Sequence, residues 1–388
     1  MIALSTERVI INITNLTIHT VSDAVLRICI VGPRSGDDAL LELSNLPKEA
    51  RIVATGNTIE ELMREEYFLD ANVLLNVSGN TETIGPIIDA LGDLRWFHSI
   101  TAGLDHVICP QMTEREDLIV TNVNPRYLYT PSYISINLLI NVKLCTAPLL
   151  PPSQQAKGVY SSSLAEYVMF ACSYFAKDAL RLLSLKQRKV WDRFCVGELR
   201  GKTMGIIGYG DIGKACAKLA KAYGMNIIAQ RRRPELSDSD PLVDYVYGSG
   251  PENILELFRQ SDYIVIAAPL TEETRGIIGK KELMEAKKGQ VLINIGRGPI
   301  IDEDALIEVL KDPYAQLVGA ALDVFSIEPL PQTSLLWTLP NVLISPHNAD
   351  MTEDFRHRSV RFFTENCHRF VFGKDEDIHC KVDKKLGY

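Results

Sequence analysis

The chain has 388 residues, of which 46% are hydrophobic and 23% are charged, and its formal net charge is −8 at pH 7. This length is sufficient for two domains, and the composition is ordinary for a soluble globular protein. The acidic balance argues against a nucleic-acid-binding protein, because such domains are usually basic.

The eight cysteines are scattered and form no C-x-x-C pair. This pattern is typical of a reducing compartment, and we expect neither a disulfide framework nor a metal site. No apolar run approaches the roughly 20 residues that a membrane span needs, so we expect no membrane partner. Residues 1–26 are interpreted as a loose leader. They match neither a signal peptide nor an Arg-rich transit peptide, and the cytoplasm is the default location, with organelle targeting left open.

Short β-branched runs alternate with helical stretches from Arg27 onward. Strands are expected at 27–32, 51–56, 72–77 and 94–101, with helical spacing at 36–43, 58–66 and 83–91. Strands that alternate with helices predict a parallel sheet covered on both faces.

A second α/β series begins near residue 203. Strands are expected at 203–208, 225–230, 262–268, 289–295, 317–324 and 341–346, with helices at 214–224 and 302–311. One long helix over 161–183 is expected to join the two series. The sequence therefore predicts two α/β units in succession.

Residues 124–156 differ from the rest of the chain. They contain only two charged residues, Arg126 and Lys143, together with five prolines and no glycine. A structureless insertion of this length is unusual inside a compact domain. A lid, an oligomerisation arm and a sequence absent from the mature protein all remain open as interpretations.

The segment 203–230 carries the most specific motif. Gly208, Gly210 and Gly213 form a G-x-G-x-x-G loop that follows an expected strand and opens an expected helix at Asp211 and Ile212. In a dinucleotide-binding unit the first glycine makes the tight turn, the second lets the pyrophosphate approach, and the third packs helix on strand. The helix N-terminus then faces the phosphates.

Three arginines, Arg231, Arg232 and Arg233, follow the next expected strand. A carboxylate is the ordinary residue for the ribose 2′-hydroxyl about 20 residues beyond the loop. A guanidinium at this position can instead hold a 2′-phosphate through paired N–H···O bonds. The sequence thus favours NADP(H) over NAD(H), which remains possible, and a solvated basic patch is the alternative.

Three further side chains come just after expected strands: Arg297, Glu328 and His347. Ligands of open α/β sheets bind outside the carboxyl ends of the strands, so these side chains are candidates to converge. Arginine binds carboxylates, histidine moves protons near neutral pH, and a nearby glutamate raises the pKa of an imidazole. Each residue also has an ordinary structural alternative.

The motifs GYGDIG, APLTEETRGIIG, NIGRG, DVFSIEP and SPH, in this order, resemble those of the D-isomer-specific 2-hydroxyacid dehydrogenases. NVSGN (76–80) and SITAGLDHV (99–107) look like the substrate-domain loops of that family. The resemblance covers residues 27–123 and 157–374. Within the family, the arginines that follow the expected strand at 225–230 suggest similarity to the glyoxylate/hydroxypyruvate reductases. It implies reduction of a small 2-oxo acid to a D-2-hydroxy acid, by a homodimer.

The resemblance also implies roles for individual residues. Arg297 binds the substrate carboxylate, His347 is the acid/base, and Glu328 is its partner. The backbone N–H groups of Val77, Ser78 and Gly79 complete the substrate site. The cofactor cleft is formed by Asp323, which holds the nicotinamide carboxamide, and by Pro269, Thr274 and Ile295.

The implied architecture has two doubly wound parallel-sheet domains joined by a hinge. A flavodoxin-like substrate-binding domain comprises 27–123 and 348–374, a Rossmann NAD(P)-binding domain comprises 157–347, and 375–388 form a tail. The family runs almost directly from Val123 into the pattern that begins at Lys157. Residues 124–156 interrupt this junction. A retained intron or a faulty gene model is therefore a further explanation of the segment.

Asn348 and Asp350 stand where the family usually has small or apolar residues, and a carboxylate there is expected to alter substrate preference. A nucleotide-sensing, corepressor-like interaction protein on the same scaffold is the alternative function. A formate dehydrogenase is disfavoured because that branch has glutamine at the position of Glu328. Phosphoglycerate oxidation stays open.

Overall fold

The computed structural model describes residues 24–33, 37–101, 103–123, 160–373 and 378–384. Residues 1–23 of the expected leader and all of the segment 124–156 lie outside the described residues. By its internal contacts the chain divides into two compact units, of which the second is Tyr160–Glu353 and the first is the remainder. The boundary after Glu353 differs from the expected one at 347, because two backbone N–H groups of the 348–353 segment are held by Asp323 of the second unit.

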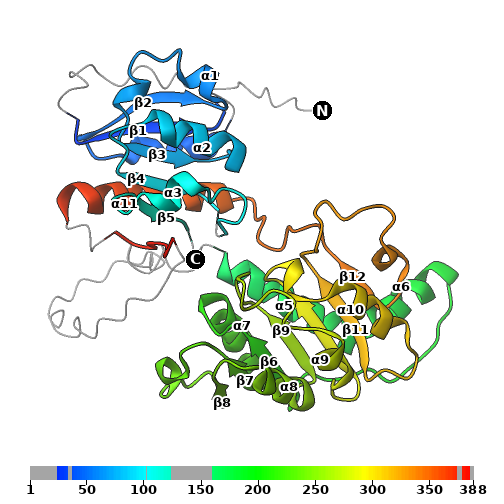
Figure 1. Ribbon diagram of the computed structural model, residues 1–388. Helices are drawn as coiled ribbons and strands as arrows, with labels where there is room; N and C mark the ends of the chain where they lie inside the picture. Colours follow the sequence, from blue (N-terminus) through cyan, green and yellow to red (C-terminus); the bar gives the residue numbers. More distant parts are fainter. Residues whose placement is uncertain (1–23, 34–36, 102, 124–159, 374–377, 385–388) are drawn as a thin grey trace, which may run out of the picture. The chain divides into compact units, whose positions relative to one another are not determined.

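The first unit contains a five-stranded parallel sheet with the order β2-β1-β3-β4-β5 (Figure 1). This is the flavodoxin-like strand order, as expected from the sequence. The strands are β1 (Leu26–Val31), β2 (Ala50–Gly56), β3 (Val73–Asn76), β4 (Trp96–Ser99) and β5 (Ile119–Thr121). The helices are η3 (Asp38–Asn45), α1 (Ile59–Leu62), η4 (Phe68–Asp70), α2 (Thr81–Ala90), α3 (Pro110–Glu114) and α11 (Phe355–Phe372).

Alternate side chains of β1 enter two separate cores, one on each face of this sheet. Ile28 and Ile30 pack in a core that also contains Phe363 of α11. Cys29 and Val31 pack in the opposite core with Ile84 of α2. Burial on both faces explains why the strand is apolar throughout and does not alternate with polar residues.

The segment 378–384 was expected to be part of a tail, but it pairs with the edge strand β5. Lys381 forms an antiparallel bridge with Thr121, and the N–H of Val382 donates to the Val120 carbonyl at 2.8 Å. These bonds cover an edge that would otherwise expose unpaired backbone groups.

The second unit contains a seven-stranded parallel sheet with the order β12-β11-β10-β9-β6-β7-β8. Its strands are β6 (Thr203–Ile207), β7 (Asn226–Gln230), β8 (Tyr245–Tyr247), β9 (Tyr263–Ile266), β10 (Gln290–Asn294), β11 (Leu317–Leu322) and β12 (Val342–Ile344). Its helices are α5 (Ser161–Ala176), α6 (Ala179–Arg188), α7 (Asp211–Ala222), η5 (Pro234–Ser237), α8 (Pro251–Gln260), α9 (Lys280–Met284), η6 (Gly298–Ile300), α10 (Glu303–Lys311) and η7 (Leu335–Thr338). The order is that of a dinucleotide-binding fold with one added strand, and it reverses between β6 and β9. The short edge strand β8 was missed from the sequence.

The expectation of one long helix over 161–183 is wrong. The chain breaks between α5 and α6 at Asp178, which has a left-handed φ of 49°. The carboxylate of Asp178 accepts a bond from the Arg181 N–H at 3.2 Å and so caps the start of α6. Aspartate suits this place because its side chain both tolerates the left-handed region and caps helices.

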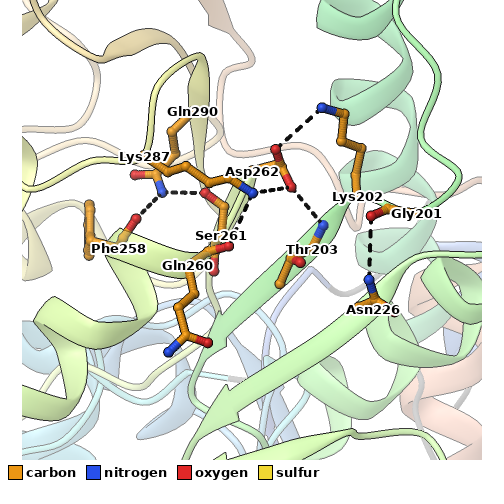
Figure 2. Close-up of polar contacts among 10 residues, drawn as sticks. All are labelled: Gly201, Lys202, Thr203, Asn226, Phe258, Gln260, Ser261, Asp262, Lys287 and Gln290. Carbon is orange, nitrogen blue, oxygen red and sulfur yellow. Dashed lines mark hydrogen bonds and ion pairs between the residues drawn. The ribbon is translucent and has the colours of Figure 1, made fainter.

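A polar cluster around Asp262 ties together the amino ends of the central strands of the second sheet (Figure 2). The Asp262 carboxylate accepts the Thr203 N–H at 2.9 Å and the ammonium of Lys287 at 2.9 Å, and Lys202 lies at 3.4 Å. Gln290 donates to the carbonyls of Phe258 and Ser261, both at 2.7 Å. Burial works against ionisation of Asp262, but these donors hold its pKa below the ordinary value.

None of the helices in the described part of the chain is both long enough and apolar enough to cross a bilayer.

Candidate active site

The glycine loop lies at the carboxyl end of β6, beside the point where the strand order reverses. A Cβ on Gly208, whose φ is 95°, would meet the backbone N of Ala268 at 2.5 Å, and one on Gly213 would meet the Gly208 carbonyl oxygen at 2.7 Å. Gly210 is different, because a Cβ there would meet nothing within 4 Å. The protein itself requires the first and third glycines, whereas the second leaves space in which a ligand can approach the backbone.

Helix α7 begins directly after this space, with Gly210 as its N-cap and without a side-chain cap. The first N–H groups of a helix have no intrahelical acceptors, and with the helix dipole they favour an anion. The carboxylate of Asp211 accepts a hydrogen bond from the Ser161 hydroxyl of α5. The open space and the uncapped helix end together fit the pyrophosphate of a dinucleotide.

Arg231 follows β7, and its Nη1 donates to the hydroxyl of Ser237 at 2.7 Å. The side chain is partly buried, and this burial, with a smaller effect of Arg233, lowers the pKa of the guanidinium. Arg232 and Arg233 are exposed. Within the ranges that the structure describes, no carboxylate forms an ion pair with Arg231 or Arg233. The arrangement leaves guanidinium N–H groups for an anionic ligand.

The loop after β9 contains the expected cleft residues Pro269 and Thr274. The Thr274 hydroxyl donates to the Pro269 carbonyl at 2.7 Å, and the N–H of Thr271 donates back to that hydroxyl at 2.8 Å. Ile295 is buried after β10, and its N–H donates to the Ile266 carbonyl at 3.1 Å. The three positions therefore follow the neighbouring strands β9 and β10 on the carboxyl side of the sheet.

Three adjacent strands present the expected acid/base group. Arg297 follows β10, Glu328 follows β11 and His347 follows β12. The Nδ1 of His347 lies 2.7 Å from Oε2 of Glu328, and Oε1 of Glu328 accepts the Phe325 N–H at 2.9 Å. The Nη1 of Arg297 donates to the carbonyl of Gly296 at 2.7 Å, and its charge acts on both partners of the pair.

Glu328 and His347 change each other's protonation. The hydrogen bond with Glu328 raises the pKa of His347 above its ordinary value, although burial and Arg297 oppose the shift. Burial alone would raise the pKa of Glu328, but the bonds from His347 and Phe325 lower it overall. A histidine whose pKa is raised by a neighbouring carboxylate is suited to act as a general acid.

Asp323 was expected to hold the nicotinamide carboxamide, but its carboxylate already accepts several bonds from the segment that carries His347. Its Oδ1 accepts the Ser345 hydroxyl, the Asn348 N–H at 3.0 Å and the Ala349 N–H at 3.2 Å. The sequence motif did not indicate these bonds. Asp350 lies nearby, and burial raises the pKa of its carboxyl.

The expected substrate donors Val77, Ser78 and Gly79 follow β3 in the first unit. The N–H groups of Val77 and Ser78 donate to the Val31 carbonyl at 2.9 and 3.2 Å. The N–H of Gly79 donates to Oδ1 of Asn76 at 2.7 Å. All three donors therefore have internal acceptors in this structure, so a substrate would have to share or replace these bonds.

Residues 169–349 match the family model "D-isomer specific 2-hydroxyacid dehydrogenase, NAD binding domain". A glyoxylate reductase of Thermococcus gammatolerans is 37% identical over 237 residues, which are 56% of this chain and 68% of that protein. A D-3-phosphoglycerate dehydrogenase of Methanocaldococcus jannaschii is 32% identical over 329 residues, or 83% of this chain. The chain spans only about half (53%) of the length of that relative.

Among solved structures, an NADPH-dependent glyoxylate/hydroxypyruvate reductase of Sinorhizobium meliloti, in complex with NADP and sulfate, has the same fold. Its TM-score is 0.69 at 22% identity, over 93% of this chain and 99% of that one. The sequence motifs, the two parallel sheets and these similarities lead to one assignment. The chain belongs to the D-isomer specific 2-hydroxyacid dehydrogenase family.

Proposed function

We propose that the protein reduces a small 2-oxo acid, such as glyoxylate or hydroxypyruvate, to the D-2-hydroxy acid, with NADP(H) as the preferred cofactor. The observation that carries this proposal is the His347–Glu328 hydrogen bond of 2.7 Å at the carboxyl end of a dinucleotide-binding sheet, with the charge of Arg297 acting on it. Glyoxylate reductases among the relatives support the substrate class.

In this proposal Arg297 binds the carboxylate of the substrate and orients its 2-oxo group. Since Nδ1 of His347 is engaged with Glu328, Nε2 is the nitrogen that donates a proton to the oxo oxygen. Glu328 stabilises the imidazolium before this transfer. NADP(H), when bound, supplies the hydride that C2 receives, so that 2-oxo acid, hydride and one proton give the 2-hydroxy acid.

The cofactor would be held by the glycine loop and helix α7, with Pro269, Thr274 and Ile295 along the neighbouring strand ends. Backbone N–H groups of Asp211, Ile212 and Gly213 would face its pyrophosphate. Val77, Ser78 and Gly79 remain the proposed substrate contacts from the first unit.

The test is a steady-state panel of 2-oxo acids with NADPH and with NADH. We expect oxidation of NADPH with glyoxylate or hydroxypyruvate and a lower kcat/KM with NADH. Absence of turnover with every acid and both cofactors would contradict the proposed reaction. Tight binding of NADPH without turnover would favour the nucleotide-sensing alternative.

Arg231 is the residue proposed to select NADPH, with Arg232 and Arg233 beside it. Its guanidinium is held in place by Ser237 and has no carboxylate partner in the described parts of the chain. The NADP in the Sinorhizobium meliloti structure agrees with this preference.

Arg231→Asp should lower kcat/KM for NADPH by about 10- to 100-fold, a loss of about 1.4–2.7 kcal/mol, and leave kcat/KM for NADH unchanged. Arg200→Ala, at an exposed arginine elsewhere in the unit, is the control, and an unchanged cofactor ratio in Arg231→Asp would remove the proposed role.

A homodimer is proposed on the basis of the family resemblance and of exposed apolar side chains on α6 and after it. Leu180, Leu182 and Leu183 are exposed on α6, and Trp191 is 96% exposed. Large apolar side chains exposed in this way are typical of a protein interface. Analytical ultracentrifugation should show a dimer for the wild type and monomers for Leu183→Arg. A monomeric wild type would contradict the proposal.

A further inference from the structure

The turn that carries His347 is fixed by a single buried carboxylate. Asp323, which follows β11, is 2% exposed. Its Oδ1 accepts bonds from the hydroxyl of Ser345 and from the backbone N–H groups of Asn348 and Ala349. A second, longer bond of 3.3 Å joins the Ala349 N–H to Oδ2. One side chain thus binds the residues on both sides of His347.

The backbone of Asp323 reinforces this arrangement. Its carbonyl accepts the N–H of His347 at 2.8 Å, and its own N–H donates to Asn294 of β10 at 3.1 Å. At the far end of the turn, the Ser163 hydroxyl of α5 donates to the Ala349 carbonyl at 2.6 Å. The turn is therefore anchored to β10, β11 and α5 at once.

His347 itself has a left-handed backbone with a φ of 51°. This conformation is unfavourable for an L-residue with a Cβ and persists only where the surroundings impose it. The bonds that Asp323 accepts hold the residues on both sides of His347 in this conformation, and the bond from Ser163 to Ala349 reinforces them. In this conformation the Nδ1 of His347 meets Oε2 of Glu328.

We infer that Asp323 is a positioning residue, whose carboxylate holds the Ser345–Ala349 turn so that the imidazole of His347 meets Glu328. This role differs from the expected bond to the nicotinamide carboxamide. Oδ1 is saturated by three donors, whereas Oδ2 accepts one long bond and retains capacity for a ligand. The inference deepens the proposed function and rests on it for the consequence in catalysis.

Several charged groups face this turn. Glu328, Arg297, Asp323 and Asp350 all act on His347. Tyr167 of α5 lies against Ser345, and burial raises the pKa of its phenol to about 12. The tyrosine is therefore neutral over the working range of pH. Among the groups that act on His347, the hydrogen bond with Glu328 has the largest effect on the pKa of the imidazole.

The test compares Ser345→Ala and Asp323→Asn with the wild-type protein in the full chain. The imidazole of His347 is titrated by NMR in histidine-labelled protein, with His347→Asn identifying its signal. The dissociation constant of NADPH is measured in parallel by its fluorescence. The titration needs no turnover, so the inference can be judged even if no 2-oxo acid is reduced.

We expect the titration midpoint of His347 to fall in Ser345→Ala, because the misplaced imidazole loses its bond to Glu328. It should fall further in Asp323→Asn, where the negative charge that also raises the pKa of His347 is removed as well. NADPH affinity should change less than about threefold in Ser345→Ala, since a serine hydroxyl contributes one bond to the turn. Where reduction is measurable, kcat should fall at least 10-fold in Asp323→Asn at saturating NADPH. The neutral asparagine oxygen accepts the three bonds more weakly than a carboxylate, and the amide nitrogen cannot accept the Ala349 N–H that Oδ2 now accepts.

The opposite pattern would overturn the inference. An unchanged His347 midpoint in the variants, together with NADPH binding weakened more than 10-fold in Asp323→Asn, would make Asp323 a cofactor residue only. If Asp323→Asn does not fold, Ser345→Ala decides alone, because it removes one of the three donors to Oδ1 and leaves the carboxylate in place. An unmoved midpoint in Ser345→Ala then contradicts the inference.

Discussion

The two edges of the second sheet use the same kinds of side chain in opposite ways. At the amino edge, Asp262 is 12% exposed, and its carboxylate is matched by two lysines and the Thr203 N–H (Figure 2). At the carboxyl edge, His347 and Glu328 are 42% and 36% exposed, and Arg297 acts on both. The carboxylate at the amino edge is compensated by two lysines, whereas the charged side chains at the carboxyl edge are more exposed. Under the proposed function, the first group stabilises the fold and the second acts on the substrate.

The largest effect on function is expected from His347→Asn. Asparagine tolerates the left-handed backbone that His347 adopts, so the turn should persist while the proton donor is lost. We expect kcat for 2-oxo acid reduction to fall by about 10²–10⁴-fold, the usual contribution of a general acid. The melting temperature should remain close to that of the wild type. Retained activity would contradict the assignment of His347 as the acid.

Asp262→Ala should show the reverse behaviour. It leaves the Thr203 N–H without its acceptor and two lysines without a counter-charge. We expect the free energy of unfolding to fall by about 2–3 kcal/mol in a urea titration, while kcat per folded molecule is unchanged. Glu308→Gln is the control, because its ion pair with Lys280 is largely exposed and should contribute less than about 1 kcal/mol. Equal effects of the two variants would show that the amino edge is not a stabilising cluster.

The pH dependence of reduction tests the His347–Glu328 pair. Because Glu328 raises the pKa of His347, the protonated acid should persist above pH 6.5, and kcat/KM should fall as pH rises through the shifted value. In Glu328→Gln the raising interaction is lost, and burial and Arg297 then act to lower the pKa. The midpoint should move to lower pH, and kcat/KM at pH 7.5 should fall about 10- to 100-fold. An unmoved midpoint would mean that Glu328 does not set the protonation of His347.

The carboxyl edge was largely predictable from the sequence, because glycine spacing and residues at strand ends have direct physical meaning. Gly208, Gly210 and Gly213 lie at the carboxyl end of β6 as expected, and the predicted partners His347 and Glu328 form a hydrogen bond. Both sheets and most of their strands followed from the alternation of apolar runs with helical stretches. Their orders agree with the expected flavodoxin-like and Rossmann folds.

The remaining features depend on long-range bonds that leave no local pattern. The acceptor role of Asp323 toward Asn348 and Ala349 joins residues 25 and 26 positions apart. The pairing of Lys381 with Thr121 likewise required the fold. The helix break at Asp178 did have a local signal, since Lys177 and Asp178 interrupt an apolar run and aspartate favours an N-cap. That signal was outweighed by the helical periodicity on both sides.

The smallest effect on activity is expected from a substitution of Asp350, which tests whether its carboxylate, at the carboxyl edge, differs in role from that of Asp262 at the amino edge. Its carboxyl is partly buried near His347, Arg297 and Asp323, and burial raises its pKa. No lysine or arginine in the described residues forms an ion pair with it, unlike Asp262. Under the proposed function, the charge of its ionised form would add to the field that a substrate meets. Asp350→Asn keeps the size of the side chain and removes this charge. We expect kcat/KM for a dicarboxylic 2-oxo acid to rise about 3- to 10-fold relative to glyoxylate, because a repulsive charge has been removed. An unchanged ratio in a steady-state comparison of the two acids would place the Asp350 charge outside the substrate's reach and leave Arg297 as the charge that selects the acid.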